Sequence, residues 1–240
     1  MNISARIRRF LRIFLIAAFM MMMPLPLQNV IPSVTEVHAA AYGLNQTSVW
    51  MNAGKTRKLK VRGAEGTIKW SSSNRKIAKV SRDGVVTALK AGKAKITASC
   101  PALSRTASCT VRVFTQASVK KKLLKLQKKY PEGKYWTNES AYYFWEAAYM
   151  HTYGCYALVG LFSDHVFGKN APIKMHTSFS KIKAGDHIRI GNYHSVVVLE
   201  KKGNRVTVVE GNYNSSVHWK RVLTKSELQS EGFFVETRYW

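Results

Sequence analysis

The sequence predicts an exported chain with two folded domains, an all-β antiparallel sandwich followed by an α+β domain. Residues 44–114 form short alternating runs separated by Gly, Asn, Asp or Ser, which is typical of a sandwich. After residue 130, helical patterns come first and alternating strands follow, an order that predicts an α+β domain. A basic and then apolar N-terminus precedes both domains and indicates export.

Residues 1–41 have the layout of a secretory signal peptide. Several arginines come first, an apolar run follows at residues 13–23, and Pro24 ends that run. The run is too short to span a bilayer comfortably, and an uncleaved anchor is the alternative. No later segment is long and apolar enough to cross a membrane. We therefore expect a secreted protein, extracellular or associated with the cell wall, with no stable membrane insertion after signal cleavage.

The chain is strongly basic. Its 240 residues carry 38 Lys and Arg against 13 Asp and Glu, a formal net charge of +25. Such a charge attracts polyanions, and charge alone does not choose between nucleic acid and cell-wall polymers. Because an exported protein meets the wall first, we expect peptidoglycan or another anionic wall polymer as the partner, and no nucleic acid.

The three cysteines leave one without an obvious partner. Cys100 and Cys109 lie on two alternating runs that a short Pro-containing turn joins. Cross-strand geometry allows a disulfide there, with two unpaired strand cysteines as the alternative. Cys155 is then left over, and a leftover cysteine in an exported protein is a candidate reactive thiol.

The first domain, residues 42–114, carries several recurring sequence blocks. They are WSSSN at 70–74, IA at 77–78, GVVTA at 84–88 and AKIT at 94–97. With these blocks the segment closely resembles the bacterial immunoglobulin-like group 2 domain. The resemblance implies an immunoglobulin-like sandwich that serves as a non-catalytic surface module, often a spacer or an adhesion unit.

Residues 115–130 are expected to form a linker and a basic amphipathic helix. Val119, Leu123, Leu126 and Tyr130 recur at helical spacing, and lysines occupy the other faces. The helix can lie on a membrane, or it can pack its apolar stripe on the C-terminal domain. Two more helices are expected over 138–150, with Asn138 as N-cap, and over 155–168, and five strands follow them.

Cys155, His194 and Glu210 form a candidate constellation for nucleophilic catalysis. Cys155 follows Gly154 at the start of an expected helix, where the helix dipole favours a thiolate. His194 begins a strand and can act as the base, and Glu210 ends the next strand and can orient the imidazole. The alternatives are an inert core cysteine, a structural histidine and an ordinary turn glutamate. No tight ligand pair supports a zinc site, so no metal is expected.

The hairpin between the expected strands of His194 and Glu210 decides whether these two side chains can meet. A three-residue loop at 201–203 would pair Glu200 with Asn204, and the same register would place Glu210 opposite His194. Asn212 would share the face of Glu210 because side chains alternate along a strand. A two-residue loop would instead turn both acid and amide away from His194.

Three sequence blocks resemble the CHAP family of cysteine, histidine-dependent amidohydrolases and peptidases. They are GCYALVG, AGDHIRIGNYHSVVVLE and VTVVEGNYN, in that order. The resemblance implies a papain-like α+β domain (CHAP/NlpC-type) over 131–240, without a cofactor. It implies Cys155 as nucleophile, His194 as base and later acid, Glu210 as orienting group and Asn212 as a supporting contact. The family usually cuts amides in peptidoglycan.

One departure from that family concerns the oxyanion hole. Many relatives carry Gln just before the cysteine block, and this chain has none. The backbone N–H of Cys155 supplies one donor, and Tyr153 and His151 are candidates for the second. Tyr135 and Trp136, together with Tyr153, are expected to line the substrate groove.

The expected function is that of a secreted cysteine amidohydrolase or endopeptidase. It would cleave peptidoglycan amides through a thiol acyl-enzyme. The alternatives are a catalytically inactive wall-binding or adhesion protein and a secreted cysteine peptidase that acts on proteins.

Overall fold

The computed structural model describes residues 41–144 and 150–240. The predicted signal peptide therefore lies outside the described residues, except for its last position. Within the described part of the chain, no helix is long and apolar enough to cross a membrane. The described fold is mostly β, with three α-helices in its C-terminal half.

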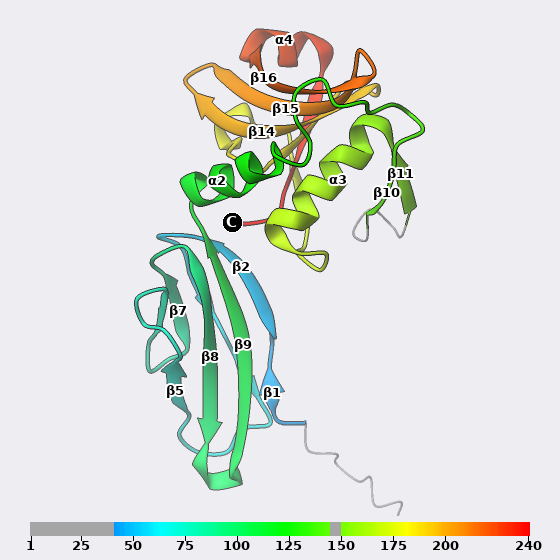
Figure 1. The fold of residues 1–240 in the computed structure, drawn as a ribbon. Coiled ribbons are helices and arrows are strands. Elements are labelled where there is room, and N and C mark those ends of the chain that lie inside the picture. Colours follow the sequence, from blue (N-terminus) through cyan, green and yellow to red (C-terminus); the bar gives the residue numbers. More distant parts are fainter. Residues whose placement is uncertain (1–40, 145–149) are drawn as a thin grey trace, which may run out of the picture. The chain divides into compact units, whose positions relative to one another are not determined.

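The N-terminal half is a β-sandwich (Figure 1). One sheet has the order β2-β9-β8-β5 and the other the order β3-β7-β6, beside a short β1-β4 pair. The bounds are β1 Gly43–Leu44, β2 Ser48–Asn52, β3 Thr56–Lys58, β4 Val61–Arg62, β5 Lys69–Ser72, β6 Ala78–Val80, β7 Val85–Ala88, β8 Gly92–Cys100 and β9 Arg105–Phe114. Both sheets contribute to one buried core that includes Met51, Val86, Ile96 and Val111. The expected sandwich is present, but β2 pairs with β9 in parallel, so it is not wholly antiparallel.

Trp70 and Gly84, from two of the sequence blocks, pack against each other. Gly84 has φ +78°, and a Cβ atom there would lie 2.6 Å from Trp70 Cζ2 and 2.8 Å from the Leu59 carbonyl oxygen. No side chain fits at that distance, so glycine is required both by conformation and by space. The spacing of the two blocks thus reflects a direct contact in the sandwich.

The predicted Cys100–Cys109 disulfide is wrong. The short 3₁₀ turn Pro101–Leu103 pairs Cys100 with Arg105, and the same register pairs Cys109 with Ile96. The two cysteines are therefore four positions apart along the ladder, about 13 Å at the usual rise per residue. A disulfide needs Cα atoms within about 7 Å. Both thiols are free, and burial raises the pKa of Cys109 to about 11.

Helix α2 (Gln116–Leu126) has the amphipathic character expected for it. It begins after Thr115, whose side chain forms a capping box with Ser118. Val119, Leu123 and Leu126 are buried in the core shared with the next long helix. The apolar stripe therefore packs on the C-terminal domain, which is the second of the two alternatives that the sequence left open.

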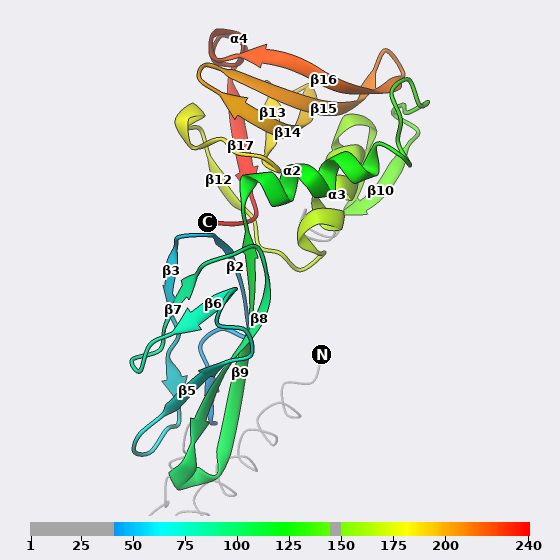
Figure 2. The same ribbon diagram turned by 60° about the vertical axis from the view of Figure 1, so that its left-hand side comes forward.

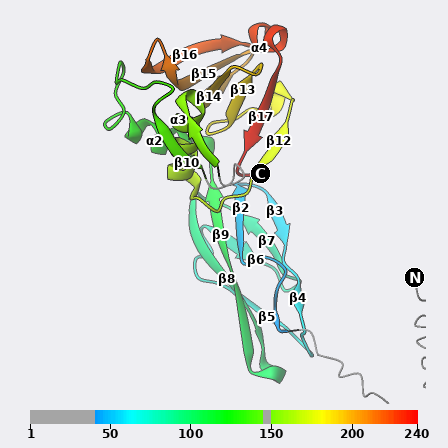
Figure 3. The ribbon, with the colours of Figure 1, turned by 90° about the vertical axis from the view of Figure 1, so that its right-hand side faces the viewer.

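The C-terminal half is built on a six-stranded antiparallel sheet with the order β12-β17-β13-β14-β15-β16 (Figures 2 and 3). The strands are β12 Lys174–His176, β13 His187–Ile190, β14 His194–Lys202, β15 Arg205–Tyr213, β16 Ser216–Thr224 and β17 Phe233–Thr237. Helix α3 (Gly154–Phe167) packs on the face that carries Val197 and Leu199. Val196 and Val198 face a second core, to which Leu228 of helix α4 (Lys225–Glu231) contributes.

The helix expected over residues 138–150 is not formed. Instead, β10 (Ala141–Phe144) pairs antiparallel with β11 (Met150–Tyr153), and residues 145–149 between them lie outside the described residues. Adjacent aromatic residues in this stretch favour a strand. Hydrogen bonding to β11, which ends just before Gly154 and Cys155, stabilises the strand over the helix that the apolar spacing predicted. Asn138 consequently caps no helix and lies in the loop before β10.

Candidate active site

Gly154 and Cys155 begin helix α3. Gly154 has φ +58°, its N–H donates to the Ser140 carbonyl at 3.0 Å, and its own carbonyl accepts from Trp136 Nε1 at 2.7 Å. These bonds fix the backbone that leads into the helix. Cys155 is thereby held in the first helical turn, where the free N–H groups favour negative charge. The residue is buried, with 8% of its surface exposed, and it borders a cavity.

The β14–β15 hairpin reaches the predicted contact by a different register. Lys202 pairs with Arg205, so the loop has two residues rather than the expected three. Taken alone, this loop would turn Glu210 away from His194. A bulge at Leu199, between Val198 and Glu200, shifts the register by one residue and pairs Glu210 with Val196. Since His194 lies two positions from Val196, it shares the face of Glu210.

His194 and Glu210 are joined by a short hydrogen bond. His194 Nε2 lies 2.6 Å from Glu210 Oε2, and Arg221 donates to the same oxygen at 3.0 Å. Glu210 is fully buried, and its Oε1 atom has no hydrogen-bond partner among the described residues. A buried carboxylate requires such cationic partners. Glu210 is therefore a buried carboxylate with two hydrogen-bonded partners, and not an ordinary turn glutamate.

Cys155 and His194 shift each other's pKa. Burial raises the pKa of the Cys155 thiol. Four other effects lower it: the hydrogen bond to His194, the charge of His194, a hydrogen bond from the Ser195 backbone and the charge of Arg189. Together they outweigh burial, so the net shift of the thiol pKa is downward. Burial lowers the pKa of His194, but its bonds to Cys155 and Glu210 raise it to about 9. Because Nε2 is engaged by Glu210, Nδ1 is the nitrogen left for the thiol. The contact therefore favours the thiolate form of Cys155 and the imidazolium form of His194.

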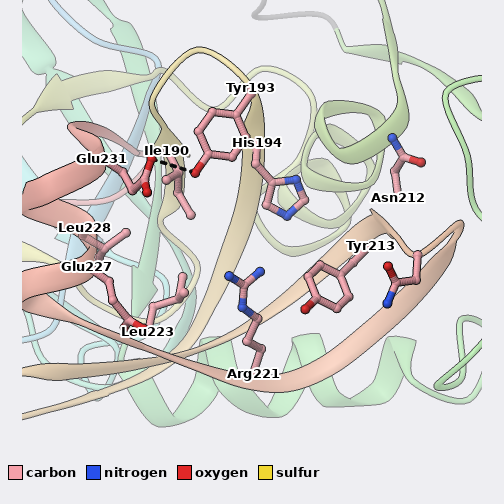
Figure 4. Close-up of a pocket in the computed structure, with 11 residues that line it drawn as sticks. Ile190, Tyr193, His194, Asn212, Tyr213, Arg221, Leu223, Glu227, Leu228 and Glu231 are labelled. Carbon is pink, nitrogen blue, oxygen red and sulfur yellow. Dashed lines mark hydrogen bonds between the residues drawn. The ribbon is translucent and has the colours of Figure 1, made fainter.

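Two cavities flank this pair. One of about 470 Å³ is lined by Cys155 and also by Asn138, Tyr153, His187, Arg189 and Tyr193, among others. The other, of about 450 Å³, is lined by His194 and by Tyr193, Tyr213, Arg221 and Leu223 (Figure 4). Tyr193 borders both cavities and is 60% exposed. Cys155 and His194 thus border two neighbouring cavities that share Tyr193 as a lining residue.

The three residues expected in the substrate groove differ in position. Tyr153 is 57% exposed and borders the cavity of Cys155. Tyr135 is 71% exposed and forms an isolated β-bridge with Ser216. Trp136 is buried and supports the Gly154 carbonyl, so the prediction that it lines a groove is wrong. Its aromatic ring packs against Tyr130 in the core, and its indole N–H fixes the start of α3.

The Asn212 side chain lies beside Gly154, at the start of helix α3, and not against the imidazole ring of His194. It has φ +58°, and its Nδ2 donates to Asn138 Oδ1 at 2.6 Å. Asn138 and Arg221 are the partners that the sequence pattern missed. The helical spacing around Asn138 concealed it, and the position of Arg221 depends on strand pairing that no local pattern reveals.

Among residues 41–144 and 150–240, no three His, Cys, Asp or Glu side chains converge as a metal site. His187 is bound instead to Glu236 through Nδ1, at 2.8 Å. The arrangement around Cys155 brings together a thiol, an imidazole and a buried carboxylate.

Comparison with known proteins identifies the first domain. Residues 40–111 match the family model of the bacterial Ig-like domain (group 2), so this segment is such a domain and the prediction for it is confirmed. Domains of this family occur in extracellular or surface proteins of bacteria. No curated protein matches the chain. The expectation of a papain-like domain over 131–240 stays a prediction.

Several solved structures share short or distant similarity with the chain. An intimin mutant of EHEC O157:H7 is 23% identical over 37% of this chain and 50% of its own, with a TM-score of 0.25. The structure of Ly7917 is 14% identical over 52% of this chain and 63% of its own, with a TM-score of 0.37. A GH10 xylanase from termite gut that contains a bacterial Ig-like domain is 21% identical, covering 44% of this chain and 29% of its own, with a TM-score of 0.24. The chain thus spans half of the intimin and less than two thirds of Ly7917.

Proposed function

We propose that residues 131–240 form a papain-like cysteine hydrolase of the CHAP type, secreted and directed at amide bonds of peptidoglycan. The observation that carries this proposal is the chain of contacts from Cys155 through His194 to Glu210, with the 2.6 Å bond between the last two. A nucleophile, a base and a group that orients the base are the three parts that thiol-dependent amide hydrolysis needs.

Acylation begins from the thiolate–imidazolium pair. Cys155 Sγ attacks the carbonyl carbon and forms a C–S bond, and the electron pair of the carbonyl moves onto its oxygen. The backbone N–H of Cys155 is one donor for that oxyanion. As the carbonyl re-forms, the C–N bond breaks and His194 gives its proton to the departing amine. The products are a thioester on Cys155, a free amine and a neutral imidazole.

Deacylation reverses these roles. Neutral His194 takes a proton from water as the oxygen attacks the thioester carbonyl, and the C–S bond then breaks. The carboxylic acid leaves, and the thiolate–imidazolium pair is restored. Glu210 keeps the imidazole oriented throughout, because its short bond to Nε2 prevents the ring from turning.

The proposed substrate follows from charge and domain context. A chain of net charge +25 is attracted to an anionic wall, and an Ig-like domain of a family found in surface proteins precedes the hydrolase. A signal peptide over residues 1–41 would bring both domains to the wall. A catalytically inactive wall-binding protein is the rival, favoured by the absence of the Gln that many relatives carry just before the cysteine block.

The test uses the mature chain, residues 42–240, with isolated peptidoglycan. Released muropeptides are separated and weighed by mass spectrometry, beside Cys155→Ala protein. We expect cleavage by the wild type alone, and the product masses identify the bond. Absence of products with several wall chemistries would favour the rival or a protein-directed peptidase, and equal cleavage by both proteins would exclude Cys155 as the nucleophile.

A further inference from the structure

The oxyanion hole of the proposed hydrolase needs a donor besides the backbone. The developing charge on the carbonyl oxygen is stabilised by hydrogen-bond donors fixed in advance around it. The N–H of Cys155 is one such donor, and Gly154 before it has no side chain to offer a second. The second donor must therefore come from another segment that borders the cavity of Cys155.

Asn138 meets this requirement. It borders the same cavity as Cys155 although it lies in the loop before β10. A Cβ atom placed on Gly154 would lie 2.5 Å from Asn138 Oδ1 and 3.5 Å from its Cγ. The amide group of Asn138 thus occupies the space in which a side chain at position 154 would begin, one residue from the nucleophile.

The orientation of this amide is set by Asn212. Asn212 Nδ2 donates to Asn138 Oδ1 at 2.6 Å, so the oxygen of Asn138 is used and its Nδ2 group remains as the donor. Asn212 itself is held in a left-handed backbone conformation at the end of β15. Tyr153, a sequence candidate for the second donor, has no such fixed partner among the contacts described and is largely exposed.

We propose that the Asn138 side-chain amide is the second oxyanion donor and that Asn212 is the positioning residue that aims it. The inference rests on the proposed function, because it needs Cys155 to attack a carbonyl. It also explains Gly154 in chemical terms: the glycine leaves room for an amide delivered from a different segment.

The test compares two reactions of the same thiol in the mature chain. p-Nitrophenyl acetate acylates Cys155 through a tetrahedral oxyanion and releases p-nitrophenolate, whereas iodoacetamide alkylates it without forming an oxyanion. The ratio of the two rate constants cancels changes in the thiolate population. Cys155→Ala protein corrects for the other two cysteines, and thermal unfolding shows that each variant is folded.

Asn138→Ala should lower the acylation rate by about 10²-fold and leave the alkylation rate unchanged. Asn138→Asp, which keeps the acceptor for Asn212 but loses the donor, should lower acylation at least as far. Asn212→Ala should give a smaller loss, and Asn170→Ala, an exposed asparagine in the loop after α3, should give none. An unchanged ratio in both Asn138 variants would overturn this assignment alone. A wild-type Cys155 no more reactive to iodoacetamide than the unfolded thiol would overturn the proposed function and this inference together.

Discussion

Glu210 pairs across the sheet with Val196, and yet its Oε2 atom lies 2.6 Å from Nε2 of His194, two positions along the strand. The bulge at Leu199 makes this possible, because it returns Glu210 to the face of His194 after a two-residue loop has turned it away. The position of the Glu210 carboxylate therefore depends on an irregularity of one residue in strand β14.

Replacement of Glu210 by Gln should impair catalysis without abolishing the fold. The amide keeps the shape of the side chain but removes the charge that raises the pKa of His194. We expect kcat/KM at pH 7 to fall by about 10²- to 10⁴-fold, the range associated with acid–base partners. Glu65→Gln, at an exposed glutamate of the Ig-like domain, is the matched control. An activity within about twofold of wild type, far from the smallest loss in that range, would show that Glu210 does not orient the base.

The raised pKa of His194 predicts how activity depends on pH. In the proposed mechanism the imidazolium donates a proton to the leaving amine, so kcat/KM should fall as the pH rises through about 9. A pH–rate profile with an alkaline limb near the ordinary histidine pKa would contradict this. In Cys155→Ala protein the pKa of His194, followed by NMR, should be lower because one of the bonds that raise it is lost.

The same histidine links stability to pH. Its pKa is about 9 in the folded chain and near 6.5 when unperturbed. Its contribution to the free energy of unfolding is therefore fully present below pH 6.5 and is lost as the pH rises through about 9. Urea unfolding at pH 6 and pH 10 should show this loss in wild type and a smaller one in His194→Gln protein. Equal losses in both would mean that other groups account for the pH dependence.

Two glycines allow a matched test of the turn before α3. Gly154 and Gly203 both have positive φ, at +58° and +52°, but a Cβ atom at Gly203 meets nothing within 4 Å. Gly203→Ala should lower the free energy of unfolding by about 1 kcal/mol from backbone conformation alone. Gly154→Ala should lower it further and slow the acylation of Cys155 by p-nitrophenyl acetate, because the new atom displaces Asn138. Equal effects of the two substitutions would show that the space around Gly154 is not critical.

The register of β8 and β9 predicts the redox state of the other cysteines. Thiol titration of the unfolded mature chain should find all three cysteines free, with and without prior reductant. In the folded chain Cys109 should react slowly, because burial raises its pKa to about 11. A disulfide between Cys100 and Cys109 would require the β8–β9 pairing to be different in solution.

The sequence by itself determined the features that depend on near neighbours. Alternation and turn residues predicted the sandwich, and helical spacing predicted the buried stripe of α2. The sequence blocks that contain Trp70 and Gly84 indicated the family of the first domain. Their spacing along the chain is specific because the two residues contact each other in the sandwich. Cys155 and His194 were singled out by residue type and by their places at element starts, which are also local properties.

Only the tertiary structure decided the contacts that join distant segments. The cysteines of β8 and β9 were separated by a turn whose length the local pattern did not reveal. The stretch around Tyr142 became a strand because it pairs with β11. Asn138 and Asn212, 74 positions apart, meet because the loop before β10 and the end of β15 converge on Gly154. Such contacts depend on register, bulges and packing over the whole domain, and a single residue of shift changes which side chains face each other.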